Sequence, residues 1–291
     1  MYKKYNSENY LFEGQSAGNL SLGTSETLRP GSLEYVAGVI DGNGNFGVRA
    51  LLNGERKLLD LRIGLPNRDL RVLTKVKIIL KCGHIKTDKN RSIYRITKKS
   101  ELERVVRLLN GHIRLKVLSF MEACEYLRVP YVMACYVISE NSPYFSGLID
   151  TCGSISYNYS NNSIVLFLEF KQNSYSEKLN LDNAVPGYQP KVYKKIKRNQ
   201  TKDKIFYSVR FEFSMTSKMI HLYDFVMKSR VYSDFKFYRF SQIKSFLQVR
   251  HFQKFPKKSS EHIAYSQWVF NFISYLNPNY NKVVYISELS L

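Results

Sequence analysis

The stretch Tyr35-Val36-Ala37-Gly38-Val39-Ile40-Asp41-Gly42-Asn43-Gly44-Asn45-Phe46 decides how the rest of this chain is interpreted. A second copy, Tyr144-Phe145-Ser146-Gly147-Leu148-Ile149-Asp150-Thr151-Cys152-Gly153-Ser154-Ile155, follows 109 residues further on. Both copies read aromatic, two variable residues, glycine, two aliphatic residues, aspartate, two residues, glycine. Two copies of so unusual a string predict that the chain is an internal repeat.

Each string has the pattern of a helix that touches another helix. The pairs Ala37-Gly38 and Ser146-Gly147 are small enough to let two backbones approach closely, so they predict a two-helix seam with a pseudo-twofold axis. Gly44 and Gly153 are expected to end the helices in a left-handed conformation. The alternative is two core helices that share small residues by chance.

The two strings resemble the LAGLIDADG motif of homing endonucleases and intron maturases, in the single-chain form that carries both motifs. The family's pattern is Leu-Ala-Gly-Leu-Ile-Asp-Ala-Asp-Gly, and its first Asp falls on Asp41 and Asp150. The resemblance implies that the second Asp holds a divalent cation at the scissile phosphate. That position is Asn43 in one copy and Cys152 in the other, so both copies lack the carboxylate.

The composition favours a polyanionic partner. The 291 residues include 44 Lys and Arg against 24 Asp and Glu, a formal net charge of +20. Nucleic acid is the first candidate and an anionic membrane the second, but no apolar run approaches the roughly 18 residues of a membrane span. The four cysteines form no close pair or Cys/His cluster, which argues against zinc and disulfide frameworks and for a reducing compartment.

The sequence predicts three regions. Residues 1–30 are expected to form a flexible arm, 31–135 the first repeat, and 136–291 the second repeat with an insertion near 172–203, interpreted as a loop between the first two strands of that repeat. In the second repeat, 204–213 is matched to the strand 57–65, 216–228 to the helix 68–80, and 238–241 to the strand 94–97.

The predicted fold is α+β. It is a pseudo-symmetric monomer of two helix–strand–strand–helix–strand–strand–helix (αββαββα) repeats, packed through the motif helices. The antiparallel sheets are expected to make one continuous saddle, apolar towards the helices and polar on an open face. Arg49, Arg62 and Arg210 are expected on that open face, where a twisted ribbon can lie in a duplex groove.

The predicted insertion is strongly basic and carries interleaved aromatic residues. We expect it to contact phosphates, although a solvated loop that only aids solubility is the alternative. The basic residues concerned are Lys191, Lys194, Lys195, Lys197, Arg198, Lys202 and Lys204.

The candidate chemistry is weak. Asn43 offers a neutral oxygen and Cys152 a soft sulfur, both poor ligands for a magnesium-like ion. Asp41 and Asp150 are the candidate ligands if cutting persists, but on a helix they point away from the cleft. The resemblance also implies a basic residue near each metal position; Lys244 fits in the second repeat, whereas in the first Lys99 lies next to the aligned Ser100.

The sequence therefore favours a nucleic-acid-binding protein that no longer cuts and needs no cofactor. Structured RNA is preferred over DNA as the partner: a group I intron, as for a maturase, or ribosomal RNA. The alternative is an active DNA homing endonuclease that uses Mg²⁺, and a decayed relic without a nucleic-acid role is a third interpretation. A composition typical of A+T-rich coding genomes favours the mitochondrial matrix, with the chloroplast second.

Overall fold

The computed structural model describes residues 31–50, 56–199 and 204–290. The predicted N-terminal arm and Lys202 lie outside these residues. The first repeat runs α1 (Ser32–Asn43), β1 (Gly44–Ala50), β2 (Arg56–Pro66), α2 (Leu70–Leu80), β3 (His84–Thr87), β4 (Arg91–Ile96), α3 (Lys99–Leu109) and α4 (Val117–Tyr126). The second runs α5 (Pro143–Cys152), β5 (Gly153–Asn158), β6 (Ser163–Lys171), β7 (Lys191–Asn199), β8 (Lys204–Phe213), α6 (Met219–Ser229), α7 (Asp234–Ser241), α8 (Ile243–Val249) and α9 (Ser260–Ser274).

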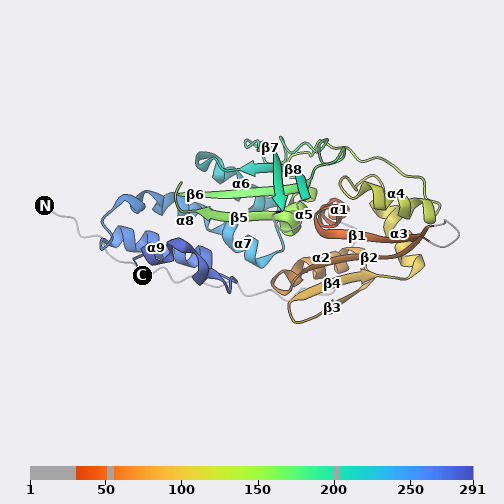
Figure 1. The fold of residues 1–291 in the computed structure, drawn as a ribbon, viewed down its shortest axis with the longest axis horizontal. Helices are drawn as coiled ribbons and strands as arrows, with labels where there is room; N and C mark the ends of the chain where they lie inside the picture. The colour runs from red at the N-terminus through yellow and green to blue at the C-terminus, as the bar shows by residue number, and fades with distance from the viewer. Residues whose placement is uncertain (1–30, 51–55, 200–203, 291) are drawn as a thin grey trace.

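The strands form two antiparallel sheets of the same topology. One has the order β1-β2-β4-β3 and the other β5-β6-β8-β7. Figure 1 shows them on either side of α1 and α5, which lie together at the middle of the molecule. The predicted pseudo-symmetric α+β fold is confirmed, with one correction. Within the described residues the strands pair into two separate sheets and not one continuous saddle, because the paired motif helices stand between them.

The seam between α1 and α5 is the closest contact between the repeats. A Cβ atom added to Gly38 would fall on the carbonyl oxygen of Tyr144, and one added to Gly147 would fall on that of Tyr35. Both additions would penetrate backbone atoms of the opposite helix. The neighbouring Val36, Ala37, Phe145 and Leu148 are fully buried, so the seam is also the centre of the core. The predicted seam is therefore present, and it requires glycine at one position of each helix.

The conformation predicted for the glycines that end the motif helices is wrong. Gly44 has φ −88° and ψ 167°, and Gly153 has φ −68° and ψ 134°, so both are extended. Each begins a strand directly after its helix. A Cβ atom there would lie 2.7 Å from Ile40 Cα at Gly44, or from Ile149 O at Gly153. The chain needs glycine because it turns sharply from helix to strand, not because φ is positive.

The second repeat departs from the predicted alignment after β6. Residues 172–190 form turns where the first repeat has α2, and residues 191–199 form the strand β7, so the predicted loop 172–203 is wrong over that range. The strand 204–213 pairs with β6 and β7, which makes it the counterpart of β4 and not of β2. Helix 216–228 consequently corresponds to α3.

The predicted strand 238–241 is also wrong, because these residues belong to α7. The Ser233 hydroxyl accepts a hydrogen bond from the Lys236 backbone N–H, which caps the start of this helix. Phe235 and Phe240 are both buried on its inner side. The alternating pattern from Tyr238 to Ser241 fits a strand as well as a helix. The Ser233 cap before α7 is the sequence feature that distinguishes the helix from the strand.

The last helices extend the second repeat beyond the end of the first. Tyr157 on β5 meets Phe246 of α8 and Trp268 of α9 edge to face, with ring centroids 5.8 and 5.5 Å apart. Figure 1 shows α8 and α9 at the end of the molecule beside β5 and β6. No helix within the described part of the chain has the length and apolar character needed to cross a membrane.

The seam predicts a strong response to the smallest possible substitution. Gly38→Ala and Gly147→Ala should each lower the free energy of unfolding by several kcal/mol, at or above the roughly 1–3 kcal/mol typical of overpacking, because the added methyl group meets backbone that cannot rotate away. Urea unfolding followed by circular dichroism measures this. Gly111→Ala is the control: its Cβ meets only Val132, at 3.5 Å and beyond, although φ is +83°, and it should cost about 1–2 kcal/mol. Equal losses in all three variants would contradict the backbone-contact seam.

Candidate functional site

The first aspartate of each motif is buried and fixed by hydrogen bonds. Asp41 Oδ2 accepts from the Arg114 N–H at 2.7 Å and from the Tyr144 hydroxyl at 2.8 Å, and Oδ1 accepts from the Lys116 N–H at 2.9 Å. Lys116 is the residue before α4. Asp41 therefore joins the end of α1 to the start of α4, and Tyr144 of the other repeat completes its shell.

Asp150 makes the same set of contacts in the second repeat. Its carboxylate accepts from the backbone N–H groups of Tyr232 and Ser233, the residues before α7, at 2.8–3.0 Å. The Tyr35 hydroxyl donates to Oδ2 at 2.8 Å. Tyr35 and Tyr144 hold the same place in the two motif copies, so each repeat supplies a tyrosine to the aspartate of the other.

Burial raises the pKa of both carboxyl groups, to about 6 for Asp150, against the opposite effect of their hydrogen bonds. The two side chains are 2% and 0% exposed. Each carboxylate already accepts three or four hydrogen bonds, so neither has a free lone pair directed at solvent. The predicted fallback role of Asp41 and Asp150 as metal ligands therefore has no support in this geometry; they position α4 and α7.

The residues at the second acidic position of the motif do not suit a divalent cation. Asn43 uses its amide N–H₂ to donate to the Gly64 carbonyl at 2.7 Å, which leaves one neutral oxygen. Cys152 donates its S–H to the Leu148 carbonyl at 3.1 Å, and burial raises the pKa of the thiol to about 12. A protonated thiol is a poor ligand for a hard cation. Among the described residues no group of three or more His, Cys, Asp or Glu could hold a metal ion.

A hollow lies at the end of each motif helix. The first, of about 430 Å³, is lined by Asn43, by Leu65 and Pro66 at the end of β2 with Arg68 and Asp69 after it, by the start of β5 and by α7. The second, of about 160 Å³, is lined by Cys152, by residues 169–171 of β6 and by Lys116 before α4. The elements correspond pair by pair across the pseudo-twofold axis. The hollows are therefore one site in two copies, with different side chains.

The first hollow is lined by three cationic side chains from both repeats: Arg68, Lys236 and Arg239. Lys236 Nζ donates to the carbonyls of Ile149 and Asp150, both at 2.7 Å, at the end of α5. Burial lowers the pKa of this ammonium group. The second hollow is lined by the cations Lys116 and Lys171 and by the carboxylates Asp41 and Glu169, of which Glu169 is bound to Arg210.

The open face of the first sheet carries a row of polar and basic residues. Asn45 of β1, Arg62 of β2 and Arg95 of β4 lie side by side across the strands. Arg95 Nε donates to Asp60 Oδ2 at 2.6 Å, and the Arg62 side chain is 55% exposed. Arg49 lies opposite Lys57 further along β1. The predicted Arg49 and Arg62 are thus on this face, with Arg95 and Lys57 in addition.

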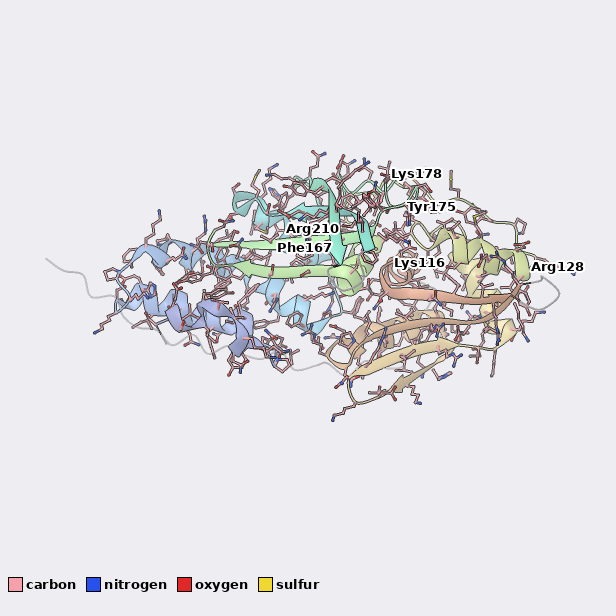
Figure 2. The ribbon with its side chains drawn as sticks, viewed as in Figure 1. Lys116, Arg128, Phe167, Tyr175, Lys178 and Arg210 are labelled. Carbon is pink, nitrogen blue, oxygen red and sulfur yellow. The ribbon has the colours of Figure 1, made fainter. Side chains whose placement is uncertain are left out.

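On the open face of the second sheet, the Arg210 side chain is less available to a ligand than the Arg62 side chain is on that of the first. Arg210 lies over the Phe167 ring, 4.0 Å from its centroid, and binds Glu169 Oε2 at 2.8 Å. Figure 2 shows the two labelled side chains together on the sheet. Arg210 is only 18% exposed. The strand register puts Lys191, Tyr193 and Lys195 beside Glu212, Arg210 and Ser208 on the same face.

Residues 191–199 of the predicted basic loop form the strand β7, which pairs with β8. Successive side chains of β7 therefore point to opposite faces of the sheet. Lys194 lies on the other side from Lys195 and pairs with Glu177 at 2.9 Å. The backbones of Lys197, Arg198 and Lys204 belong to β7 and β8.

The two predicted supporting lysines lie away from both hollows. Lys244 is in α8, 4.4 Å from the Tyr223 ring centroid, and not at the end of a fourth strand, because that strand ends at Phe213. Lys99 is the first residue of α3, and its Nζ lies 5.6 Å from the Tyr126 ring centroid.

Sequence reasoning missed Arg68, Arg95, Lys236 and Arg239. The alternation Arg91-Ser92-Ile93-Tyr94-Arg95 could have placed Arg95 on the open face, since Tyr94 and Ile96 are the apolar partners. The other three residues follow β2 or lie on α7. Their meeting depends on the correct alignment of α7 with α4, which the incorrect strand prediction at 238–241 prevented.

Comparison with known proteins gives a family match over the first repeat. Residues 36–127 match the model described as LAGLIDADG endonuclease. Three solved structures with similar folds are the LAGLIDADG meganuclease I-CpaMI bound to uncleaved DNA (14% identity, 76% of this chain and 93% of that chain, TM-score 0.50), the homing endonuclease I-GzeII with its DNA target (11%, 89% and 96%, 0.49), and the meganuclease I-AabMI bound to uncleaved DNA (17%, 76% and 91%, 0.48). The likeness to I-CpaMI supports the two-repeat fold in one chain.

The exchanged tyrosines predict a matched pair of stability losses. Tyr35→Phe and Tyr144→Phe should each cost about 1–3 kcal/mol, because each leaves a buried carboxylate short of one donor. Tyr275→Phe, at a side chain that is 37% exposed, should change stability by less than about 0.5 kcal/mol. Chemical unfolding of the three variants tests this, and a loss confined to one member of the pair would contradict the reciprocal arrangement.

Proposed function

We propose that this chain, a two-repeat protein of the LAGLIDADG family, binds nucleic acid through the open faces of its sheets and does not cut it. One observation carries the proposal. The scaffold and a basic open face are retained, while both motif positions that would hold a metal have neutral side chains engaged with backbone carbonyls. A net charge of +20 supplies the long-range attraction to a polyanion.

The proposed loss of cutting rests on Asn43 and Cys152, which are poor ligands for a magnesium ion. Magnesium ions at a phosphodiester usually require one or two carboxylates besides phosphate oxygens and water. Asn43 and Cys152 supply no charge, and the nearest motif carboxylates are buried under α4 and α7. Among the described residues that line the second hollow, Glu169 is the one acidic side chain besides Asp41, and it is bound to Arg210 and Ser208.

Structured RNA is the preferred partner in this proposal. A protein that no longer cuts can still stabilise a folded RNA, and binding through shape and backbone suits such a ligand. A group I intron would make the chain a maturase, and ribosomal RNA would make it a ribosome-associated protein. We place it in the mitochondrial matrix, with the chloroplast second, on composition alone. The competing function is DNA binding as an active homing endonuclease, which is favoured by the DNA complex of I-CpaMI.

A cleavage assay separates the two functions. The wild-type protein should bind but show no magnesium- or manganese-dependent cutting of randomised DNA duplexes. Asn43→Asp with Cys152→Asp should create divalent-cation binding, measured by calorimetry, because it restores one anionic ligand at each motif end. Asn45→Asp, an acidic substitution two residues further along the chain and on the open face of β1, is the control and should not create cation binding. Specific double-strand cutting by the wild type would overturn the proposal.

The open face can be tested by its salt dependence. Arg49→Gln with Arg62→Gln should weaken binding to RNA and DNA duplexes and lower the slope of log K against log salt by up to about 1.8 on DNA, about 0.9 for each phosphate that is no longer neutralised. Arg107→Gln, in an exposed pair with Glu103 on α3, should leave the slope unchanged. Tighter binding of intron RNA than of duplex DNA at equal salt is the result expected for a maturase. Equal slopes in the Arg49→Gln, Arg62→Gln double variant and in Arg107→Gln would contradict nucleic-acid binding through the open face of the first sheet.

A further inference from the structure

We infer that the hollow at the end of α1 binds one phosphate group of the nucleic-acid backbone directly, through Arg68, Lys236 and Arg239 and without a metal ion. This inference rests on the proposed nucleic-acid binding and assigns it a specific contact outside the open sheet faces. The hollow lies where the two repeats meet, between the end of α1, the start of β5 and α7. Figure 1 shows α7 near α5 and β5 in the centre of the molecule.

The charges of the first hollow are unbalanced. Among the residues that line it, the three cations face one carboxylate, Asp69, which accepts a hydrogen bond from the Ser233 hydroxyl and lies 3.9 Å from Arg68 Nε. The buried Asp150 carboxylate also attracts the Lys236 ammonium group. The three cations exceed these two carboxylates by one charge, so an anion can enter the first hollow with net attraction.

The cations are held in place before any ligand arrives. Arg68 and Arg239 both lie over the ring of Phe235, 4.0 and 4.1 Å from its centroid. Arg239 Nη1 donates to the Ile155 carbonyl at 2.6 Å, while its buried Nε has no hydrogen-bond partner within the described residues. Two guanidinium groups on one ring repel each other. Burial and then the charge of Arg68 lower the pKa of Arg239 to about 10. An anion beside both groups would relieve that repulsion.

The remaining donors suit a phosphate oxygen. Lys236 Nζ donates to two carbonyls, and an ammonium group has three donors, so one is left. Ser154 and Thr151 also line the hollow. Asn43 stands where the family pattern has an aspartate. A carboxylate there would repel a phosphate held without a metal ion, so the neutral amide and the three cations fit the same ligand. A volume of about 430 Å³ leaves room for the neighbouring sugar or water.

Arg68→Gln tests the inference with Arg71→Gln as its matched control. Arg71 lies three residues further on and also meets α7, through Asp234 at 2.7 Å, but does not line the hollow. The Arg68 side chain is 38% exposed, so the substitution should leave the fold intact, which circular dichroism checks. All measurements contain EDTA to exclude metal ions. Inorganic pyrophosphate is the first probe, and duplexes of RNA and DNA are the second.

Pyrophosphate should raise the melting temperature of the wild type and Arg71→Gln but not of Arg68→Gln. On DNA, Arg68→Gln should lower the slope of log K against log salt by about 0.9, the value for one phosphate, and weaken binding uniformly across sequences. Arg68→Lys should recover part of the slope because it keeps the charge. Equal pyrophosphate shifts and equal slopes in Arg68→Gln and Arg71→Gln would overturn the inference and leave these cations as a clamp between the repeats.

A mixed result also decides between the sources of the phosphate. If pyrophosphate stabilises the protein only when Arg68 is present, but the wild type binds neither RNA nor DNA, then the anion site exists and the backbone is not its ligand. That outcome contradicts the proposed function and this part of the inference together. If nucleic acid binds with an unchanged slope in Arg68→Gln, the proposed function survives and the site in the hollow fails.

Discussion

The close approach of α1 and α5 is the constraint on which the rest of the structure depends. Each helix presents a glycine to the other's backbone, and this spacing brings Tyr35 within reach of Asp150 and Tyr144 within reach of Asp41. A wider seam would break both hydrogen bonds and leave two buried carboxylates short of a donor. The starts of α4 and α7 would loosen as well, because the same carboxylates accept their backbone N–H groups. Packing and polar contacts therefore stabilise one geometry.

This arrangement explains why the first motif aspartate can persist where the second is absent. Asp41 and Asp150 hold the starts of α4 and α7 in place, so replacing either residue should lower the free energy of unfolding directly. Asn43 and Cys152 serve no comparable role, since one hydrogen bond to a backbone carbonyl satisfies each side chain. A chain that gives up metal chemistry can thus change these two positions without losing its scaffold. In this chain the first acidic position of the motif is required by the fold, and the second makes no contact that requires an acid.

The sequence predicts the seam and the first repeat well because local pattern and tertiary contact agree there. The small residues 37–38 and 146–147 predict the seam, the alternation of apolar residues predicts β2, and the helical spacing of apolar residues predicts α2. The second repeat breaks that agreement after Lys171. Turns replace a helix, and a basic strand, β7, has exposed apolar residues such as Ile196 on a face where a core is expected. Aligning 204–213 with β2 then displaced every later element, including α7, so three residues of the first hollow could not be placed.

The two hollows show how a duplicated fold loses its symmetry. The backbone forms a matching hollow at the end of each motif helix, but the side chains that line the two hollows contact different neighbours. In the second hollow Glu169 belongs to the open face, where Arg210 and Ser208 bind it, so its charge is balanced locally. In the first the corresponding position, fixed by the pairing of Gly44 with Ile63 and of Gly153 with Leu168, is Gly64, which brings no charge. Among the described residues that line this hollow Asp69 is the one carboxylate, and the buried Asp150 also attracts Lys236 of α7. The two hollows also differ in their cations, which are Arg68, Lys236 and Arg239 in the first and Lys116 and Lys171 in the second, so the asymmetry arises at several positions.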